Sequence, residues 1–337
     1  MNQWDDLTDS ISMHDLYLEF AEAEVKRDDN HRGRAHLYYT NENNIPQCLK
    51  RILKGTTTFS FERMKFNNVC NLDSFKQAKL DKCANVEVLK VDHCDALQSL
   101  DINGLEELRS LKLIECENVE HLQGLETRDK LVWMRWTPCR AKVVDYKLLT
   151  SLRVLQLTKV SHTTIIDLRN CHNLQELAIQ NSHGLEDFPL FPDSKSMRKI
   201  CFAYCTGLRH RGPELLNLEG WINVEFLDLS YCWSATNELE SCPIMKNLKH
   251  FDVSYCNNLN VLPDLTLSKN LITLNVVKCI ELLKTYASSS QFLDSMPTDL
   301  HPGLNTSRVS LHYQAVASRI VGKFGVSTQV SSLQLKD

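Results

Sequence analysis

Residues 224–282 decide the fold, because one nine-residue pattern occurs in them three times. The sequence reads VEFLDLSYC at 224–232, LKHFDVSYC at 248–256 and LITLNVVKC at 271–279. Positions 4 and 6 of each copy are apolar and alternate with mainly polar neighbours, which is the period of a β-strand with one buried face. Position 9 is cysteine, a small side chain that buries easily and suits a corner where the chain turns away. The pattern therefore predicts one short strand in each copy.

Seven further copies occur upstream in the same register. They begin at Phe61, Val86, Leu108, Leu131, Leu152, Leu174 and Met197. The ten starting residues are 21–27 residues apart, a spacing typical of the leucine-rich repeat. Position 9 is cysteine in seven copies, at Cys94, Cys116, Cys139, Cys205, Cys232, Cys256 and Cys279. We therefore predict an α/β fold, a leucine-rich-repeat solenoid in which about ten repeats form a parallel-strand horseshoe.

Composition and charge argue against several classes of function. The net charge of -4 at pH 7 gives no general positive field for nucleic acid or a membrane surface. No run approaches the length of apolar sequence needed for a membrane span. The first residues lack the basic and apolar regions of a signal peptide. We therefore expect a cytoplasmic or nuclear protein whose 13 cysteines are reduced and mostly buried.

Neither a metal site nor a catalytic site is predicted. Cys201, Cys205 and His210 have ligand-like spacing, but Cys205 is a corner residue and Cys201 lies on the opposite face of its strand. No second cysteine pair follows at zinc-finger spacing. Neither H-E-x-x-H nor G-x-S-x-G occurs. We expect no cofactor and no enzymatic activity in this chain.

The repeats occupy one of four expected segments. Residues 1–30 contain an amphipathic helix over 12–25, with Ser12 as its N-cap. Residues 31–60 form a polar linker and a cap that protects the first repeat. The repeats span 61–283. Residues 284–337 are expected to be irregular and partly disordered, with a weak helical stretch at 313–324.

The triplet Met13-His14-Asp15, followed by a helix and then by cysteine-type repeats, resembles the C-terminal part of the plant nucleotide-binding leucine-rich-repeat disease-resistance proteins. In that family the triplet closes the winged-helix part of the nucleotide-binding module, and its histidine faces the ADP phosphates. The resemblance therefore makes residues 1–30 a winged-helix remnant and assigns Met13, His14 and Asp15 to a nucleotide site. The family's phosphate-binding loop, G-x-x-x-x-G-K-[ST], does not occur in this chain. ADP or ATP is thus expected only where the missing module is supplied.

The expected binding surface is the side of the strands formed by positions 2, 3, 5, 7 and 8, here called the strand face. Positions 4 and 6 point to the core, so the strand-face side chains lie in rows across neighbouring strands and line the concave side of a horseshoe. Aromatic and arginine side chains are favoured at protein–protein interfaces. The predicted partner-binding residues are Trp133, Arg135, Arg198, Tyr204, Phe226, Tyr231, His250 and Tyr255.

Two interpretations of the strand face stay open. Asp228 and Asp252, with Ser230 and Ser254, would form an ordinary solvent-exposed ladder, whereas tyrosine at position 8 in three of four successive copies favours a binding patch. Trp136 differs, because it occupies position 6 and is predicted to lie in the core together with Phe202, Phe251 and Leu229.

The function predicted first is a protein-recognition scaffold of an intracellular plant immune receptor. It would bind a protein ligand or restrain an intramolecular nucleotide switch module. The alternative is the substrate-recruiting repeat domain of a ubiquitin-ligase adaptor. That reading needs an F-box-like helical module upstream, which the residues before Phe61 match poorly.

Overall fold

The structure is a computed structural model. It describes residues 36–40, 63–67, 77–80, 84–138, 146, 148–160, 166–192, 195–208, 218–232, 245–263, 265 and 267–282. The helix expected at 12–25, the Met13-His14-Asp15 triplet and the segment 284–337 lie outside these residues.

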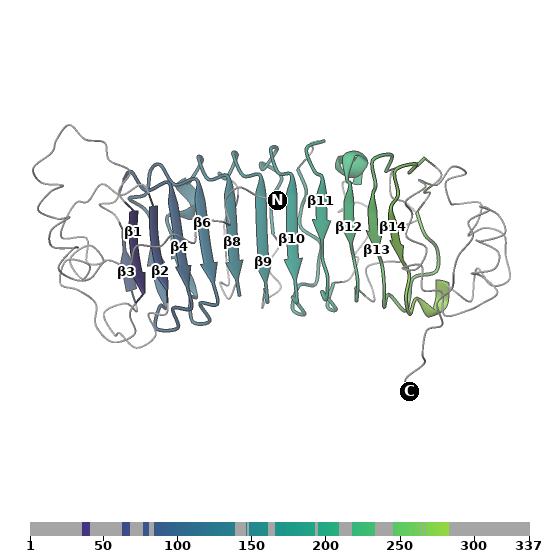
Figure 1. Cartoon of the computed structure of the whole chain (residues 1–337), viewed down its shortest axis with the longest axis horizontal. Coiled ribbons are helices and arrows are strands. Elements are labelled where there is room, and N and C mark those ends of the chain that lie inside the picture. Colours follow the sequence, from purple (N-terminus) through teal and green to yellow (C-terminus); the bar gives the residue numbers. More distant parts are fainter. Residues whose placement is uncertain are drawn as a thin grey trace, which may run out of the picture. The chain divides into compact units, whose positions relative to one another are not determined.

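The chain forms two compact units, Met1–Leu152 and Arg153–Asp337. Within the first unit five strands pair side by side, all parallel (Figure 1). In order across the sheet they are β1 (His36–Thr40), β2 (Arg63–Asn67), β4 (Val88–Asp92), β6 (Ser110–Ile114) and β8 (Trp133–Thr137). A second parallel sheet in this unit contains β3 (Gln77–Lys79), β5 (Ser99–Asp101) and β7 (His121–Gln123).

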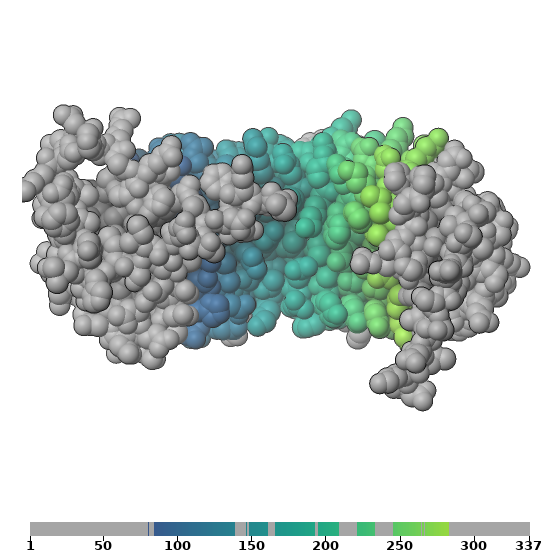
Figure 2. Space-filling view, in the orientation of Figure 1, coloured from purple at the N-terminus to yellow at the C-terminus, as the bar shows by residue number. Residues whose placement is uncertain are grey.

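The described residues of the second unit form six parallel strands in sequence order (Figure 1). They are β9 (Val154–Thr158), β10 (Glu176–Gln180), β11 (Lys199–Cys201), β12 (Phe226–Asp228), β13 (His250–Asp252) and β14 (Thr273–Asn275). Within this unit the colours of the described residues follow one another from teal to yellow-green in Figure 2. Each repeat thus packs on its neighbours in sequence, as in a solenoid.

The predicted repeat register is confirmed. Each of the ten copies contains a strand that begins at its position 3, and successive strands pair with position 3 against position 3. The chain is a leucine-rich-repeat solenoid of parallel strands. Helical structure in the described residues is limited to the 3-10 helices η2 (Leu125–Thr127) and η3 (Leu218–Asn223) and a turn at 280–282. Among the described residues, the side opposite the strands is therefore built mainly from turns and short strands.

The core is formed by the side chains at positions 4 and 6. From the Val86 copy onward, every described residue at these positions is buried. Trp136 and Phe202 have no solvent exposure, and Phe251 and Leu229 have at most 1%. The four core residues predicted from the sequence are confirmed. Aromatic rings extend the core of the second unit, where Phe191 packs edge-to-face on Trp221 with ring centroids 5.4 Å apart.

The cysteines at position 9 form a ladder of hydrogen bonds between repeats. The thiols of Cys205, Cys232, Cys256 and Cys279 each donate to the carbonyl oxygen at position 6 of the preceding copy, over 2.9–3.1 Å. In the Leu174 copy Ser182 takes the cysteine's place, and its hydroxyl accepts the N–H of Val160 at 3.0 Å. Position 9 therefore suits a small side chain that is easily buried and still forms a hydrogen bond with a backbone N–H or carbonyl group at the corner.

None of the eight cysteines that the structure describes forms a disulfide, and all eight are buried. Burial raises the pKa of Cys205 and Cys279 to about 12 and the pKa of Cys201 to about 11. Thiolates, not thiols, react with alkylating agents. These side chains are therefore structural and chemically inert near neutral pH.

Alkylation provides a direct test of this state. At pH 8 we expect iodoacetamide to leave Cys205 and Cys279 unmodified in the folded chain and to label both in urea, as read by peptide mass spectrometry.

The same pKa shifts make the free energy of unfolding depend on pH. Since folding raises the pKa of the two thiols above the 9.0 of an exposed thiol, the stabilisation from their protonated forms is complete below pH 9. It is lost as the pH rises from 9 to about 12. Rapid labelling of Cys205 and Cys279 in the folded chain at pH 8 would contradict their assignment as buried, unreactive thiols.

Candidate functional site

Position 8, which follows the end of the strand, has a left-handed backbone in eight of the ten copies. The φ angles there lie between 49° and 61°, a region that side chains other than glycine seldom adopt. The residues are His93, Glu115, Lys159, Asn181, Tyr204, Tyr231, Tyr255 and Lys278. In the Leu131 copy position 8 is Pro138, joined to Thr137 by a cis peptide bond. The conformation therefore belongs to the repeat and not to one residue type.

Hydrogen bonds between repeats hold position 8 in place. The N–H of Tyr204 donates to the carbonyl of Ser230 at 2.9 Å, and the N–H of Tyr231 donates to Ser254 at 2.9 Å. The N–H of Tyr255 donates to Val277 at 2.6 Å. Because this backbone is fixed, side chains at position 8 of successive copies must leave the corner in the same direction.

The three tyrosines at position 8 form one continuous stack. The ring centroids of Tyr204 and Tyr231 are 4.1 Å apart with planes 15° from parallel, and those of Tyr231 and Tyr255 are 4.2 Å apart and 9° from parallel. Tyr204 is 42% exposed, and the other two are half-buried. The hydroxyl of Tyr204 and burial together raise the pKa of Tyr231, so its phenol is neutral at physiological pH.

Asp228 and Asp252, at position 5, have a structural role beside this stack. Their carboxylates accept the N–H groups of Ser230 and Ser254 at 2.9 and 2.8 Å, two residues along the chain. Asn275 donates its side-chain amide to Asp252 at 2.8 Å. The two serines are buried. The acids therefore close the turns that lead to the tyrosines, which favours the ladder interpretation for Asp228 and Asp252 but leaves the tyrosines themselves unexplained.

Position 3 adds a second row of rings. Phe226 and His250 lie on paired strands with ring centroids 5.8 Å apart. The Lys199 ammonium lies 5.3 Å from the centre of the Phe226 ring, within cation–π range. His250 contacts the Thr273 hydroxyl through Nδ1 at 2.9 Å. This row and the tyrosine stack flank Asp228 and Asp252, so the second unit carries a half-exposed surface of aromatic groups around two carboxylates.

Six of the eight predicted partner-binding residues belong to this second unit. Five of them form the ring rows: Tyr204, Phe226, Tyr231, His250 and Tyr255. Arg198 is exposed, but its guanidinium donates to the carbonyls of Lys195 and Met197 at 2.9 and 3.2 Å, so it is held against its own loop. Trp133 and Arg135 lie on β8 of the first unit, where the Lys112 ammonium sits 4.4 Å from the centre of the Trp133 ring.

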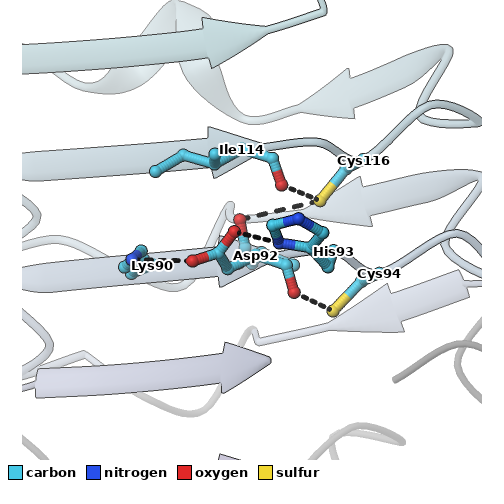
Figure 3. A network of polar contacts seen from close by, with 7 residues as sticks. Lys90, Asp92, His93, Cys94, Ile114 and Cys116 are labelled. Carbon is cyan, nitrogen blue, oxygen red and sulfur yellow. Dashed lines mark hydrogen bonds and ion pairs between the residues drawn. The ribbon is translucent and has the colours of Figure 1, made fainter. Parts of the chain in front are cut away.

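A polar network on the first unit was not predicted from the sequence. Lys90 and His93 both contact the carboxylate of Asp92, at 2.7 and 2.8 Å, and the Cys94 thiol donates to the Asp92 carbonyl at 3.3 Å (Figure 3). The attraction to Lys90 and His93 outweighs burial and lowers the pKa of Asp92. Reading position 5 down the copies would have revealed Lys90 as part of a row of cations.

The other sequence predictions concern metals and membranes. Within the described ranges no group of three or more histidine, cysteine or acidic side chains could hold a metal ion. Cys201 instead accepts a hydrogen bond from Gln180 at 3.1 Å. His14 and His210 lie outside the described residues. None of the described helices has the length and apolar character of a membrane span.

Neither a protein-family model nor a curated protein matches the chain. Nine chains of solved structures resemble it, among them the three that follow. The leucine-rich-repeat domain of the type III effector XopL is 17% identical, with 88% of this chain and 84% of that one covered and a TM-score of 0.34. A leucine-rich-repeat protein of Leptospira interrogans is 15% identical, with 70% and 83% covered and a TM-score of 0.22. The plant peptide hormone receptor RGFR1, in complex with RGF2, is 11% identical, with 74% and 55% covered and a TM-score of 0.21.

Proposed function

We propose that the chain is a protein-recognition scaffold that binds a protein partner on the strand face of its second unit. The stack of Tyr204, Tyr231 and Tyr255 carries this proposal. None of the three side chains is in the core, and the backbone beneath them is already fixed by the corner hydrogen bonds. A ladder needed only for folding would not require the same large aromatic residue in three copies, since His93, Glu115 and Lys278 occupy the same backbone position elsewhere.

The stack has the physical properties of an interaction hot spot. Tyrosine offers a large apolar ring and a hydroxyl, and it loses little side-chain entropy on binding. Here each ring is already held by its neighbour at 4.1–4.2 Å, so even less freedom remains to be lost. A partner with an apolar group for the exposed ring of Tyr204 and hydrogen-bonding groups for the hydroxyls would fit this surface.

The proposed biological context is that of an intracellular plant immune receptor acting in the cytoplasm or nucleus. It is supported by the order of Met13-His14-Asp15 ahead of cysteine-type repeats. In that context the tyrosine stack would bind a protein ligand or hold a nucleotide switch module in its inactive state. Retrieval of a nucleotide-binding module would support this context, whereas retrieval of ubiquitin-ligase components would support the adaptor reading.

The test compares partner retrieval by the unchanged chain and by a Tyr204→Ala/Tyr231→Ala/Tyr255→Ala variant. Loss of a hot-spot residue costs more than about 1 kcal/mol of binding free energy, so we expect the triple variant to bind captured partners at least about tenfold more weakly. Glu115→Ala is the matched control, because it places alanine on the same left-handed backbone in the first unit. Unchanged retrieval by a triple variant with a native circular dichroism spectrum would refute the proposal.

A further inference from the structure

The phenol groups of the tyrosine stack lie next to one another. The hydroxyl of Tyr204, burial and the hydroxyl of Tyr255 all raise the pKa of Tyr231, so both neighbouring hydroxyls lie within reach of the central one. The rings are nearly parallel at 4.1 and 4.2 Å between centroids, which brings the carbon atoms beside each hydroxyl against the next ring. These ortho carbons share the unpaired electron when a phenol loses an electron and a proton. The stack therefore holds together the atoms that join in a dityrosine bond.

Tyr204 gives an oxidant access to the stack. It is 42% exposed, whereas Tyr231 and Tyr255 are half-buried. The row of tyrosines stops on both sides, because position 8 is Asn181 in the preceding copy and Lys278 in the following one. Among the described residues the three rings contact no other aromatic ring. A phenoxyl radical formed on either outer tyrosine therefore has Tyr231 as its neighbouring ring.

The backbone beneath the stack keeps the rings in place for coupling. The N–H groups of Tyr204 and Tyr231 each donate at 2.9 Å to the carbonyl at position 7 of the next copy. Two groups that are held face to face react as if each were present at a very high concentration. Tyrosines on two separate chains lack this advantage. Coupling within one chain is therefore favoured over the joining of two chains.

We propose that Tyr231 forms a dityrosine cross-link with Tyr204 or Tyr255, with hydrogen peroxide as the oxidant and a haem peroxidase as the catalyst. Each of the two phenols gives up one electron and one proton, and a carbon–carbon bond forms between their ortho carbons. The hydrogens on those two carbons then move to the phenol oxygens, which restores both aromatic rings. Hydrogen peroxide takes up the two electrons and two protons and becomes two molecules of water.

The cross-link joins two neighbouring copies of the repeat covalently. It is a modification site on the strand face of the second unit, and it does not depend on whether the stack also binds a partner. A cross-link between repeats restricts the unfolded chain more than the folded one. The oxidised chain is therefore expected to unfold at a higher temperature than the unoxidised chain.

The test exposes the full chain, without a partner, to a haem peroxidase and hydrogen peroxide. Dityrosine fluorescence reports the bond, and peptide mass spectrometry identifies two joined peptides that have lost two hydrogens. We expect Tyr231→Phe to lower the yield of cross-link within one chain at least about tenfold, because it removes the phenol that both pairs share. Tyr255→Phe is the matched control, since it also removes one phenol but leaves Tyr204 and Tyr231 paired. Phenylalanine keeps the ring at each site, and circular dichroism checks that both variants fold.

Joined peptides that contain Tyr231, present in the unchanged chain and lost in Tyr231→Phe, would support the inference. Three results would overturn it: no dityrosine in the unchanged chain, equal yields in the two variants, or cross-links found only between chains on a denaturing gel. Partner retrieval is a separate measurement. If the triple-alanine variant loses its partners but no dityrosine forms, the recognition function holds and only the cross-link fails.

Discussion

Replacing Trp136 by alanine is expected to lower the free energy of unfolding by about 3–5 kcal/mol. Trp136 lies on β8 at position 6, has no solvent exposure and is among the largest fully buried side chains. It lies in register with Leu113 of β6, which is also fully buried, so truncation leaves a cavity between two repeats. Its indole N–H has no hydrogen-bond partner among the described residues, so the expected loss comes from packing and burial. Urea unfolding followed by far-UV circular dichroism measures it.

Trp133 provides the control for this prediction, since it has the same side chain on the same strand. It occupies position 3 and is half-exposed. Trp133→Ala is therefore expected to cost about 1 kcal/mol or less, mainly through the lost contact with Lys112. Equal losses at the two positions would mean that the alternation of buried and exposed side chains along β8 is wrong.

Gly207→Ala is expected to have the second largest effect, a loss of about 1–3 kcal/mol from overpacking. Gly207 follows the corner at Cys205, where the chain passes close to the preceding repeat. A Cβ on Gly207 would lie 2.1 Å from the carbonyl oxygen of His183 and 3.2 Å from that of Leu185. Both are backbone atoms, so the clash is relieved only if one repeat shifts against the next. Thermal unfolding would measure the loss.

Asn258 is the matched site for Gly207, because it is the eleventh residue of the Leu248 copy as Gly207 is of the Met197 copy. It is exposed and carries a side chain at that place. Asn258→Ala is expected to change stability by less than about 0.5 kcal/mol. A Gly207→Ala variant as stable as the unchanged chain would show that the two repeats are not as close as described.

Much of the fold could be predicted from the sequence, because each copy repeats the same physical signal. Alternation at positions 4 and 6 locates every strand from β2 to β14 that belongs to a copy. The same signal misses β1, whose sequence HLYYT lacks the leucine pattern and which is recognised by its pairing with β2. It also misses β3, β5 and β7, because these three strands lie outside the nine-residue copies.

The candidate site was less predictable than the fold. The tyrosines stand out in the sequence because they share one position in three copies. Their stacking depends on the left-handed backbone at position 8, which residues as different as Glu115, Asn181 and Lys278 also adopt, so composition gives no signal for it. The row of cations at position 5 was not recognised in the sequence for another reason. Lys90, Lys112 and Arg135 are 22 or 23 residues apart and meet only through the strand register.

Hydroxyl-radical footprinting of the chain with and without a captured partner tests the central claim most directly. If the partner binds the strand face of the second unit, oxidation of Tyr204, Tyr231 and Tyr255 will fall sharply in the complex. Oxidation of Leu148 and Leu267, which are 54% and 41% exposed and lie off that face, will stay unchanged. Protection of the two leucines with unchanged oxidation of the tyrosines would contradict the account.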